Sequence, residues 1–203
     1  MAVAGTTALS AAEVETPAQR ERRIRIVQAA LGLATRGGYD DVQMREVAER
    51  SGVALGTLYR YFPSKVHLLV HAMGHELERM ATRLQRRSIP GDTATERVEW
   101  VLERATRSLQ KDPNLTEAMI RAMMAADASV AVDVAAVRGS MQSMIMDALR
   151  GNGEPGEDDA LYAGILQDVW FARQIAWLGG RISSADVWRD IEASIRLVLR
   201  HHP

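Results

Sequence analysis

The chain has 203 residues, of which 47% are hydrophobic and 25% are charged, a balance typical of a globular protein with a sizeable core. Cysteine is absent, which excludes disulfides, thiolate metal sites and cysteine nucleophiles. No apolar run reaches the roughly 18 residues of a membrane span, and residues 1–15 lack the basic start and apolar block of a secretory signal. We therefore expect a cytoplasmic protein that does not engage a membrane.

The net charge of −1 hides an uneven distribution of charged residues. Residues 17–65 carry nine basic and five acidic side chains, whereas residues 66–203 carry sixteen basic and nineteen acidic ones. A basic first third joined to a slightly acidic remainder indicates a head that binds a polyanion and a body with a different task.

Apolar residues recur at helical spacing and strand patterns are nearly missing, which predicts an all-α fold of about nine helices. We expect residues 1–15 to be a disordered arm. The first helix should start at Thr16-Pro17, where a capping residue precedes proline, and stop at Gly37-Gly38. The remaining helices are predicted at 43–50, 54–61, 64–87, 93–110, 113–125, 128–150, 157–178 and 184–200.

Residues 42–62, VQMREVAERSGVALGTLYRYF, have the residue pattern of a helix-turn-helix. Gly52 stands where the chain must turn, and the small Ala48 stands where the second helix would cross the first. The positions that should face the core of a three-helix unit are apolar: Val47, Val53 and Leu58. The alternative is a plain helical hairpin within a bundle, which leaves the surrounding basic charge unexplained. We therefore expect a DNA-binding domain at 16–63 and a helical domain for ligand binding and dimerisation at 64–203.

The second helix of such a unit lies in the major groove of DNA. Arg60 is the side chain on this helix that can make a bidentate contact to guanine, and Gly56 lets the backbone approach the duplex. Lys65, at the start of the next helix, would meet a phosphate. The full set of expected DNA contacts is Gln43, Arg45, Leu55, Gly56, Thr57, Tyr59, Arg60, Tyr61 and Lys65.

The body combines many methionines with few aromatic residues, since the chain has 10 Met but only 2 Phe. Methionine adapts its shape to an apolar ligand, so we expect a large apolar pocket with few polar anchors; core filling is the alternative for each methionine. Gln174 and Arg121 are candidate polar anchors, and the alternative for Arg121 is a surface salt bridge. The expected lining is Trp100, Met119, Met123, Met124, Met141, Met144, Trp170, Gln174 and Trp177.

The last two predicted helices, 157–178 and 184–200, each carry a broad apolar face. Two such faces fit a four-helix interface with the same helices of a second copy, because symmetric dimers bury the same patch on both subunits. Burial within one subunit is the alternative. A dimer is also what a head that covers one half-site requires.

Two further patterns carry no chemistry. His67, His71 and His75 share one helix face, as zinc or nickel ligands can, but neither a cysteine nor a His-Glu-x-x-His motif completes a site, so we interpret them as packing or surface histidines. Residues 151–156 match G-x-G-x-x-G by letter, yet they follow a helix and contain Pro155. We expect no catalytic residue, no metal site and no cofactor.

Residues 25–69 resemble the DNA-binding segment of TetR-family repressors, with a first helix ending in Gly-Gly-Tyr, the helix-turn-helix and then Leu-Tyr-Arg-Tyr-Phe-Pro-Ser-Lys. The resemblance implies a dimer that binds palindromic operators and releases them when a small ligand enters the C-terminal domain. By position, the family's usual DNA contacts fall on Thr57, Tyr59, Tyr61 and Lys65, and Tyr61 stands where many members have His.

Three further segments, 115–129 (LTEAMIRAMMAADAS), 152–155 (NGEP) and 168–178 (DVWFARQIAWL), are similar to the subgroup of this family that represses sterol catabolism. That similarity implies a coenzyme A thioester of a cholesterol-derived 3-oxo steroid acid as the effector. The alternatives are a TetR-type regulator that responds to a fatty acyl-CoA or a drug, and an all-α enzyme or lipid carrier. We expect ligand binding to tilt the helix at 64–87 and so change the spacing of two heads.

Overall fold

The computed structural model describes residues 16–85, 89–154, 156–200 and 202, and every regular element in these ranges is helical. The predicted all-α fold is therefore confirmed, whereas the predicted arm at 1–15 lies outside the described residues. The elements are α1 (Pro17–Asp41), α2 (Met44–Ser51), α3 (Leu55–Tyr61), α4 (Lys65–Gln85), α5 (Ala94–Gln110), α6 (Pro113–Met124), the 3₁₀ turn η1 (Ala128–Val130), α7 (Ala131–Arg150), α8 (Asp159–Leu178) and α9 (Ser184–Val198).

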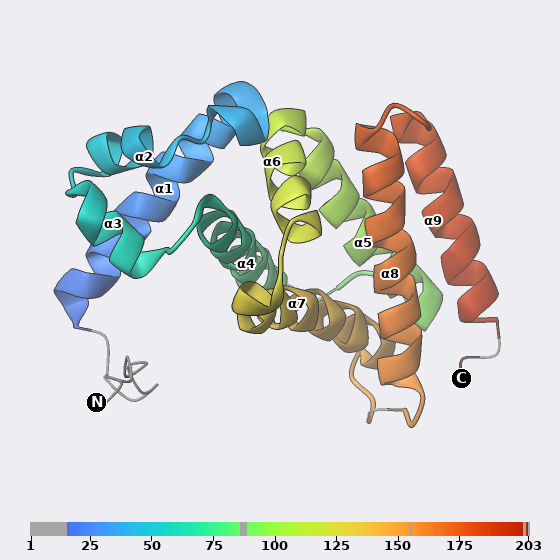
Figure 1. Ribbon diagram of the computed structural model, residues 1–203. Coiled ribbons are helices and arrows are strands. Elements are labelled where there is room, and N and C mark those ends of the chain that lie inside the picture. Colours follow the sequence, from blue (N-terminus) through green and yellow to red (C-terminus); the bar gives the residue numbers. More distant parts are fainter. Residues whose placement is uncertain (1–15, 86–88, 155, 201, 203) are drawn as a thin grey trace, which may run out of the picture.

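The molecule is elongated, with α1, α2 and α3 forming a head at one end and α5 to α9 forming a body at the other (Figure 1). Helix α4 runs from the head into the body and packs against α1, α6 and α7, while α8 and α9 pack side by side at the far edge. The apolar core is continuous from head to body, from Leu33 through Leu69 to Ile145. A change in the body can therefore reach the head through packed side chains. None of the described helices is long and apolar enough to cross a membrane.

Helix starts are capped as the sequence predicts. Thr16 accepts a hydrogen bond from the backbone N–H of Gln19, whose side chain accepts one from the N–H of Thr16, and Pro17 occupies the first helical position. Thr93 and Ser183 build the same reciprocal arrangement at the starts of α5 and α9. Each such cap satisfies backbone donors that a helix start leaves without partners.

Two glycines adopt the left-handed backbone that their turns require. Gly38 has φ of +71° and breaks the helical geometry near the end of α1, as the Gly37-Gly38 pair predicts. Gly52 has φ of +68° and ends α2, which lets α3 fold back and completes the helix-turn-helix. A side chain at either position would force a strained backbone.

Candidate nucleic-acid interface and ligand cavity

Helix α3 turns one face into the head and the other outward. Leu58 is fully buried and fixes the helix in the core of the head. Tyr59 is 45% exposed, and Gly56 and Arg60 are exposed beside it. A Cβ placed on Gly56 would meet no atom within 4 Å, so this face is open for close approach to another molecule. The outward face is therefore available as a reading surface.

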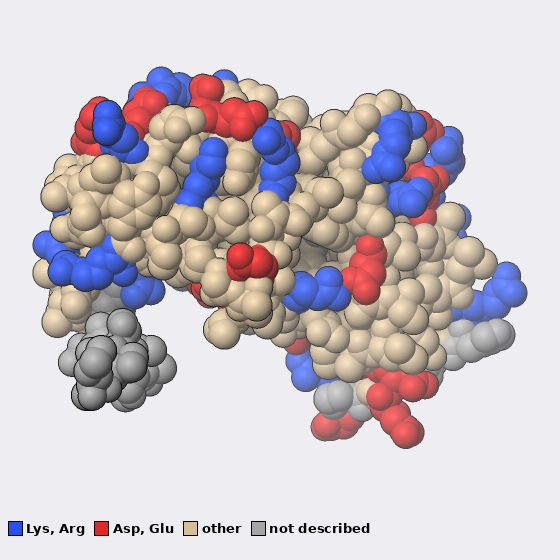
Figure 2. Space-filling model, viewed as in Figure 1, with Lys and Arg blue, Asp and Glu red and all other residues tan. Residues whose placement is uncertain are grey.

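The two arginines expected to contact DNA are free to do so. Arg60 on α3 and Arg45 on α2 are exposed and make no hydrogen bond or ion pair with any residue that the structure describes. Figure 2 shows basic side chains gathered over α3 and the start of α1, with few acidic ones beside them. A positive surface around an exposed short helix suits a phosphate backbone.

The other expected contacts lie around this face with different exposures. Leu55, Thr57 and Tyr61 are half-buried. Gln43 is exposed at the start of α2, and its Nε2 donates to the carbonyl of Asp40 at 2.7 Å. The structure thus brings these residues together in the head, whereas Lys65 lies where the head meets the body; contact of any of them with DNA remains a prediction.

Other arginines of the head hold the head together. Arg25 donates from Nε to the carbonyl of Ser51 at 3.3 Å, at the end of α2. Arg36 and Arg50 both pair with Glu46, each at 3.0 Å. These side chains explain part of the basic charge of residues 17–65 without DNA.

Lys65 has a partner inside the protein. Its Nζ donates to the carbonyl of Tyr39 at 3.0 Å and lies 4.0 Å from the centre of the Tyr39 ring. Burial lowers the pKa of Lys65, and the nearby carboxylate of Asp40 opposes that effect. Lys65 therefore ties the start of α4 to the end of α1, a role that the sequence did not reveal.

Arg121 of α6 packs against the same tyrosine as Lys65. It pairs with Asp40 at 2.9 Å and with Glu117 at 2.9 Å, and its guanidinium lies 4.5 Å from the Tyr39 ring centre. The hydrogen bond from Arg121 holds the pKa of the Asp40 carboxyl below its usual value. The salt-bridge alternative for Arg121 is thus confirmed. We call Tyr39, Asp40, Lys65, Glu117 and Arg121 the head–body junction.

Backbone contacts strengthen the junction. Glu117 accepts from the backbone N–H of Tyr39 at 2.8 Å, and a Cβ on Gly38 would come within 2.6 Å of the same carboxylate. Asn114, at the start of α6, donates to the carbonyls of Thr35 and Arg36, both at 3.2 Å. Helix α6 is therefore bonded along the last turns of α1, so a movement of α6 must pull on the head.

A cavity of about 460 Å³, here called the main cavity, opens between α4, α5, α6 and α8. Its apolar wall consists of Met73, Leu77, Met80, Trp100, Ala105, Leu109, Met119 and Trp170. Its polar lining consists of Glu76, Arg83, Glu103, Arg104, Arg107, Ser108 and Lys111. The size suits a small molecule with an apolar body.

Three of the residues predicted to line a pocket, Trp100, Met119 and Trp170, line the main cavity. Trp170 also donates from its indole Nε1 to Thr106 Oγ1 at 3.0 Å, which fixes the ring against α5. A buried indole that has such a partner keeps a defined orientation. The wall on this side is therefore preformed.

The remaining methionines and Trp177 are scattered. Met141 is buried, Met123 and Trp177 are half-buried, and Met144 lines a different cavity. Met124 is 64% exposed at the end of α6, so its placement inside a pocket is wrong for this chain. Methionine content alone did not separate wall from core because the two share the same chemistry.

Gln174 has an unusual environment. It is 0% exposed, and neither its Nε2 nor its Oε1 has a hydrogen-bond partner. It lies one helical turn beyond Trp170 on the buried face of α8. Since buried amides almost always have partners, this group is a candidate anchor for a polar atom of a ligand.

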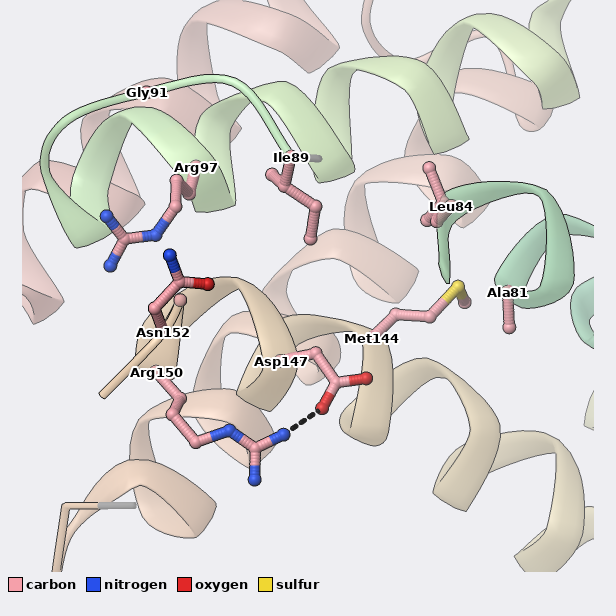
Figure 3. Close-up of a pocket in the computed structure, with 10 residues that line it drawn as sticks. Ala81, Leu84, Ile89, Gly91, Arg97, Met144, Asp147, Arg150 and Asn152 are labelled. Atoms are coloured by element: carbon pink, nitrogen blue, oxygen red, sulfur yellow. Dashed lines mark hydrogen bonds and ion pairs between the residues drawn. The ribbon is translucent and has the colours of Figure 1, made fainter. Parts of the chain in front are cut away.

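The second cavity, of about 370 Å³, lies near the ends of α4 and α7 (Figure 3). Its arginines are already occupied. Arg97 donates to the carbonyls of Ala148 and Leu149 at 2.8 and 2.9 Å, and Arg150 pairs with Asp147 at 2.7 Å. These bonds close the end of α7, so we interpret this cavity as structural.

Sequence reasoning missed the α4 side of the main cavity. Met73, Leu77 and Met80 stand at i, i+4 and i+7 on one face of α4, a spacing that predicts a shared surface. It also missed the basic residues at the opening, because pairing of a surface arginine depends on neighbours from other helices. The expected pocket also included Met144 of α7, which lines the second cavity instead.

Comparison with known proteins matches both parts of the chain. Residues 26–72 match the bacterial regulatory proteins of the tetR family, and residues 91–198 match the tetracyclin repressor-like C-terminal domain. The chain is 47% identical over 191 residues to the HTH-type transcriptional repressor KstR of Mycolicibacterium smegmatis, covering 94% of this chain and 93% of that protein. It is 44% identical over 198 residues to KstR of Mycobacterium tuberculosis, covering 98% and 90%.

Solved structures agree on the fold. A TetR transcriptional regulator from Rhodococcus sp. RHA1 has a TM-score of 0.83 and 37% identity, covering 92% of this chain and all of that one. FadR from Bacillus subtilis, solved in complex with stearoyl-CoA, has a TM-score of 0.64 and 19% identity, covering 86% and 96%. The TetR-family resemblance predicted from the sequence is confirmed, and the chain is 44–48% identical to KstR repressors of three species.

Proposed function

The chain belongs to the TetR family of bacterial regulatory proteins and is a DNA-binding transcriptional repressor; we propose that a steroid acyl-CoA thioester releases it from genes of sterol catabolism. The single observation that carries this proposal is a preformed apolar cavity in a chain 44–48% identical to KstR repressors. Release of a repressor from DNA by a bound ligand involves no chemical reaction, so we assign no enzymatic activity to this protein. Because a repressor acts on the chromosome, we propose that it works in the cytoplasm.

The repressor binds a palindromic operator as a homodimer. One head presents one α3 and therefore covers one half-site, and two heads must reach major grooves about 34 Å apart. Helices α8 and α9 lie at the edge of the body and expose Leu161, Ile165 and Leu197 at 59%, 41% and 66%. Apolar side chains of that size on one helix pair favour a symmetric interface with a second copy.

The effector fits the main cavity by shape and by its few polar groups. Trp100, Met119 and Trp170 offer a flat apolar wall, which suits fused rings. Gln174 is not among the residues that line the main cavity; it lies buried one turn beyond Trp170 on α8, and its unpartnered amide would donate to a carbonyl oxygen, or accept from a hydroxyl, of a ligand that reaches past Trp170. A ring system carrying one oxygen function satisfies both features.

Helix α6 connects the cavity to the head. Met119 lines the cavity, while Glu117 and Arg121, on either side of it in sequence, hold Tyr39 and Asp40 of α1. A ligand that displaces Met119 therefore strains the head–body junction. We expected ligand binding to reach the head through tilting of α4. Helix α6 supplies a second route, because Arg121 of α6 and Lys65 of α4 both contact Tyr39 of α1. A coupling of about 1–3 kcal/mol changes operator affinity roughly 5–150-fold.

The test is displacement from DNA. A labelled duplex from the region upstream of the protein's own gene is bound to the dimer and titrated with a 3-oxo steroid acyl-CoA, stearoyl-CoA and a hydrophobic drug. The proposal predicts release at the lowest concentration by the steroid thioester. Release by stearoyl-CoA or the drug alone would assign a different effector, and failure to bind the duplex at low salt would overturn the repressor itself.

A further inference from the structure

One histidine of α4, the helix that runs from the head into the body (Figure 1), contacts both of these parts. The ring of His71 packs against that of Phe62, the residue that follows α3, with ring centroids 5.3 Å apart. Its Nδ1 lies 3.9 Å from a carboxylate oxygen of Asp133, in the first turn of α7. His71 therefore lies between the end of α3 in the head and the start of α7 in the body.

The contact with Phe62 reaches the helix that is expected to read DNA. Phe62 is 5% exposed, and its backbone N–H donates to the carbonyl of Leu58 at 2.9 Å. Leu58 is the buried residue that fixes α3 in the head. Because packed interiors have few voids, a shift of the His71 ring must be taken up by Phe62 and so by the end of α3. The packing of α3 therefore depends on the state of His71.

Charges of opposite sign face His71 from the head and from the body. Arg23 belongs to α1 in the head and Asp133 to α7 in the body, while His75 and Glu78 lie on α4 itself. Burial lowers the pKa of His71, Arg23 and His75 lower it further, and the two carboxylates oppose them. The ring is therefore mainly neutral near neutral pH. A proton on it would be repelled by Arg23 and attracted by Asp133.

The other two histidines on this face of α4 have different partners. His67 shares a hydrogen bond with Ser64 Oγ at 2.9 Å, and His75 Nδ1 lies 3.7 Å from a carboxylate oxygen of Glu76 on its own helix. Among the residues that the structure describes, neither ring packs against an aromatic ring of the head. His75, one turn along the same helix from His71, therefore offers a matched control.

From this geometry we infer that His71 is an acid-sensitive contact between head and body, so that a proton on its ring loosens α3 and weakens operator binding without any effector. Helix α3 would then have to be ordered again on binding DNA, which costs affinity. The packed arrangement favours the neutral ring, so its contribution is complete above the ordinary histidine pKa of about 6.5 and decreases as pH falls from that value toward the lowered one. A single proton changes the binding constant by at most about tenfold per pH unit.

Operator binding without effector, measured by fluorescence anisotropy at constant salt, tests the inference at about pH 7.5 and about pH 5.5, on either side of the ordinary histidine pKa. His71→Phe keeps a ring against Phe62 but takes up no proton, so it corrects for every other group that titrates. We expect the two proteins to bind alike at the higher pH and the unchanged protein to bind at least about threefold more weakly than His71→Phe at the lower pH. His75→Gln should keep the response of the unchanged protein. Equal affinities of the unchanged protein and His71→Phe at both pH values, or tighter binding by the unchanged protein in acid, would overturn the inference.

A second variant keeps the test decisive if His71→Phe is less stable and unfolds at a lower temperature. Asp133→Asn removes the carboxylate that attracts the charged ring, which lowers the pKa of His71 further. The acid response of operator binding should therefore move to lower pH, while affinity near neutral pH stays the same. An acid response at the same pH as in the unchanged protein would contradict the role of His71.

Discussion

The reading surface of the head and the main cavity of the body are built in opposite ways. The reading surface comes from consecutive residues of α3, held by one buried leucine, and its polar groups point away from the protein. The main cavity takes its wall from four helices, α4, α5, α6 and α8, whose lining residues run from Met73 to Trp170, so its shape depends on how these helices pack. The reading surface is therefore specified locally, by consecutive residues, and the main cavity only by the packing of helices. Each should therefore fail separately when its own residues change.

The largest effect is expected at the reading surface. Arg60→Ala should cost about 1–3 kcal/mol per half-site and relax base preference, because a bidentate guanine contact is lost. Affinity for the effector should stay within twofold, since Arg60 has no contact with the body. Binding to a panel of operator variants by fluorescence anisotropy measures this, and unchanged preference at every operator position would remove Arg60 from the reading role.

The opposite result, loss of effector binding without loss of operator binding, is expected at the main cavity. Trp100→Ala should weaken effector binding about tenfold, roughly 1.4 kcal/mol, through loss of the apolar wall, while operator binding without effector is unchanged. Met144→Ala, in the second cavity, is the control and should leave effector affinity unaltered. A larger loss in the Met144 variant would place the effector in the second cavity.

A smaller effect is expected where the two sites meet. Arg121→Gln removes the ion pairs to Asp40 and Glu117, so the coupling between sites should fall by about 0.5–2 kcal/mol while each ligand still binds. Arg138→Gln, which breaks an exposed pair with Asp168 far from the head, is the control. Curves of operator displacement by the effector, measured with both variants, test this. If the effector releases the Arg121 variant from the operator as completely as it releases the unchanged protein, α6 is excluded as a route.

The smallest effect is expected at Lys65. Lys65→Ala should weaken all operators by a similar factor and lower the slope of log affinity against log salt by about 1, if the side chain leaves Tyr39 for a phosphate on binding. An unchanged salt slope would show that Lys65 serves only the junction. A change confined to one operator position would contradict both roles.

Features specified by neighbouring residues could be predicted from the sequence, whereas features that depend on packing could not. Capping pairs such as Thr16-Pro17 and turn glycines such as Gly52 act over a few residues, so the helix positions were predictable to within a few residues. The α3 face was predictable for the same reason. Met124 was misplaced because a methionine in a helix faces the core or the solvent according to neighbours that come from elsewhere in the chain. The junction was invisible because Lys65, Tyr39 and Arg121 meet only after α6 packs on α1.

Effector and operator should compete because each favours a different one of two states of the repressor. The most direct test measures effector affinity by calorimetry with and without a saturating operator duplex, because coupling between binding sites is reciprocal. The operator should weaken effector binding by the same factor by which the effector weakens operator binding, about 5–150-fold. Equal effector affinity in the presence and absence of operator would contradict it.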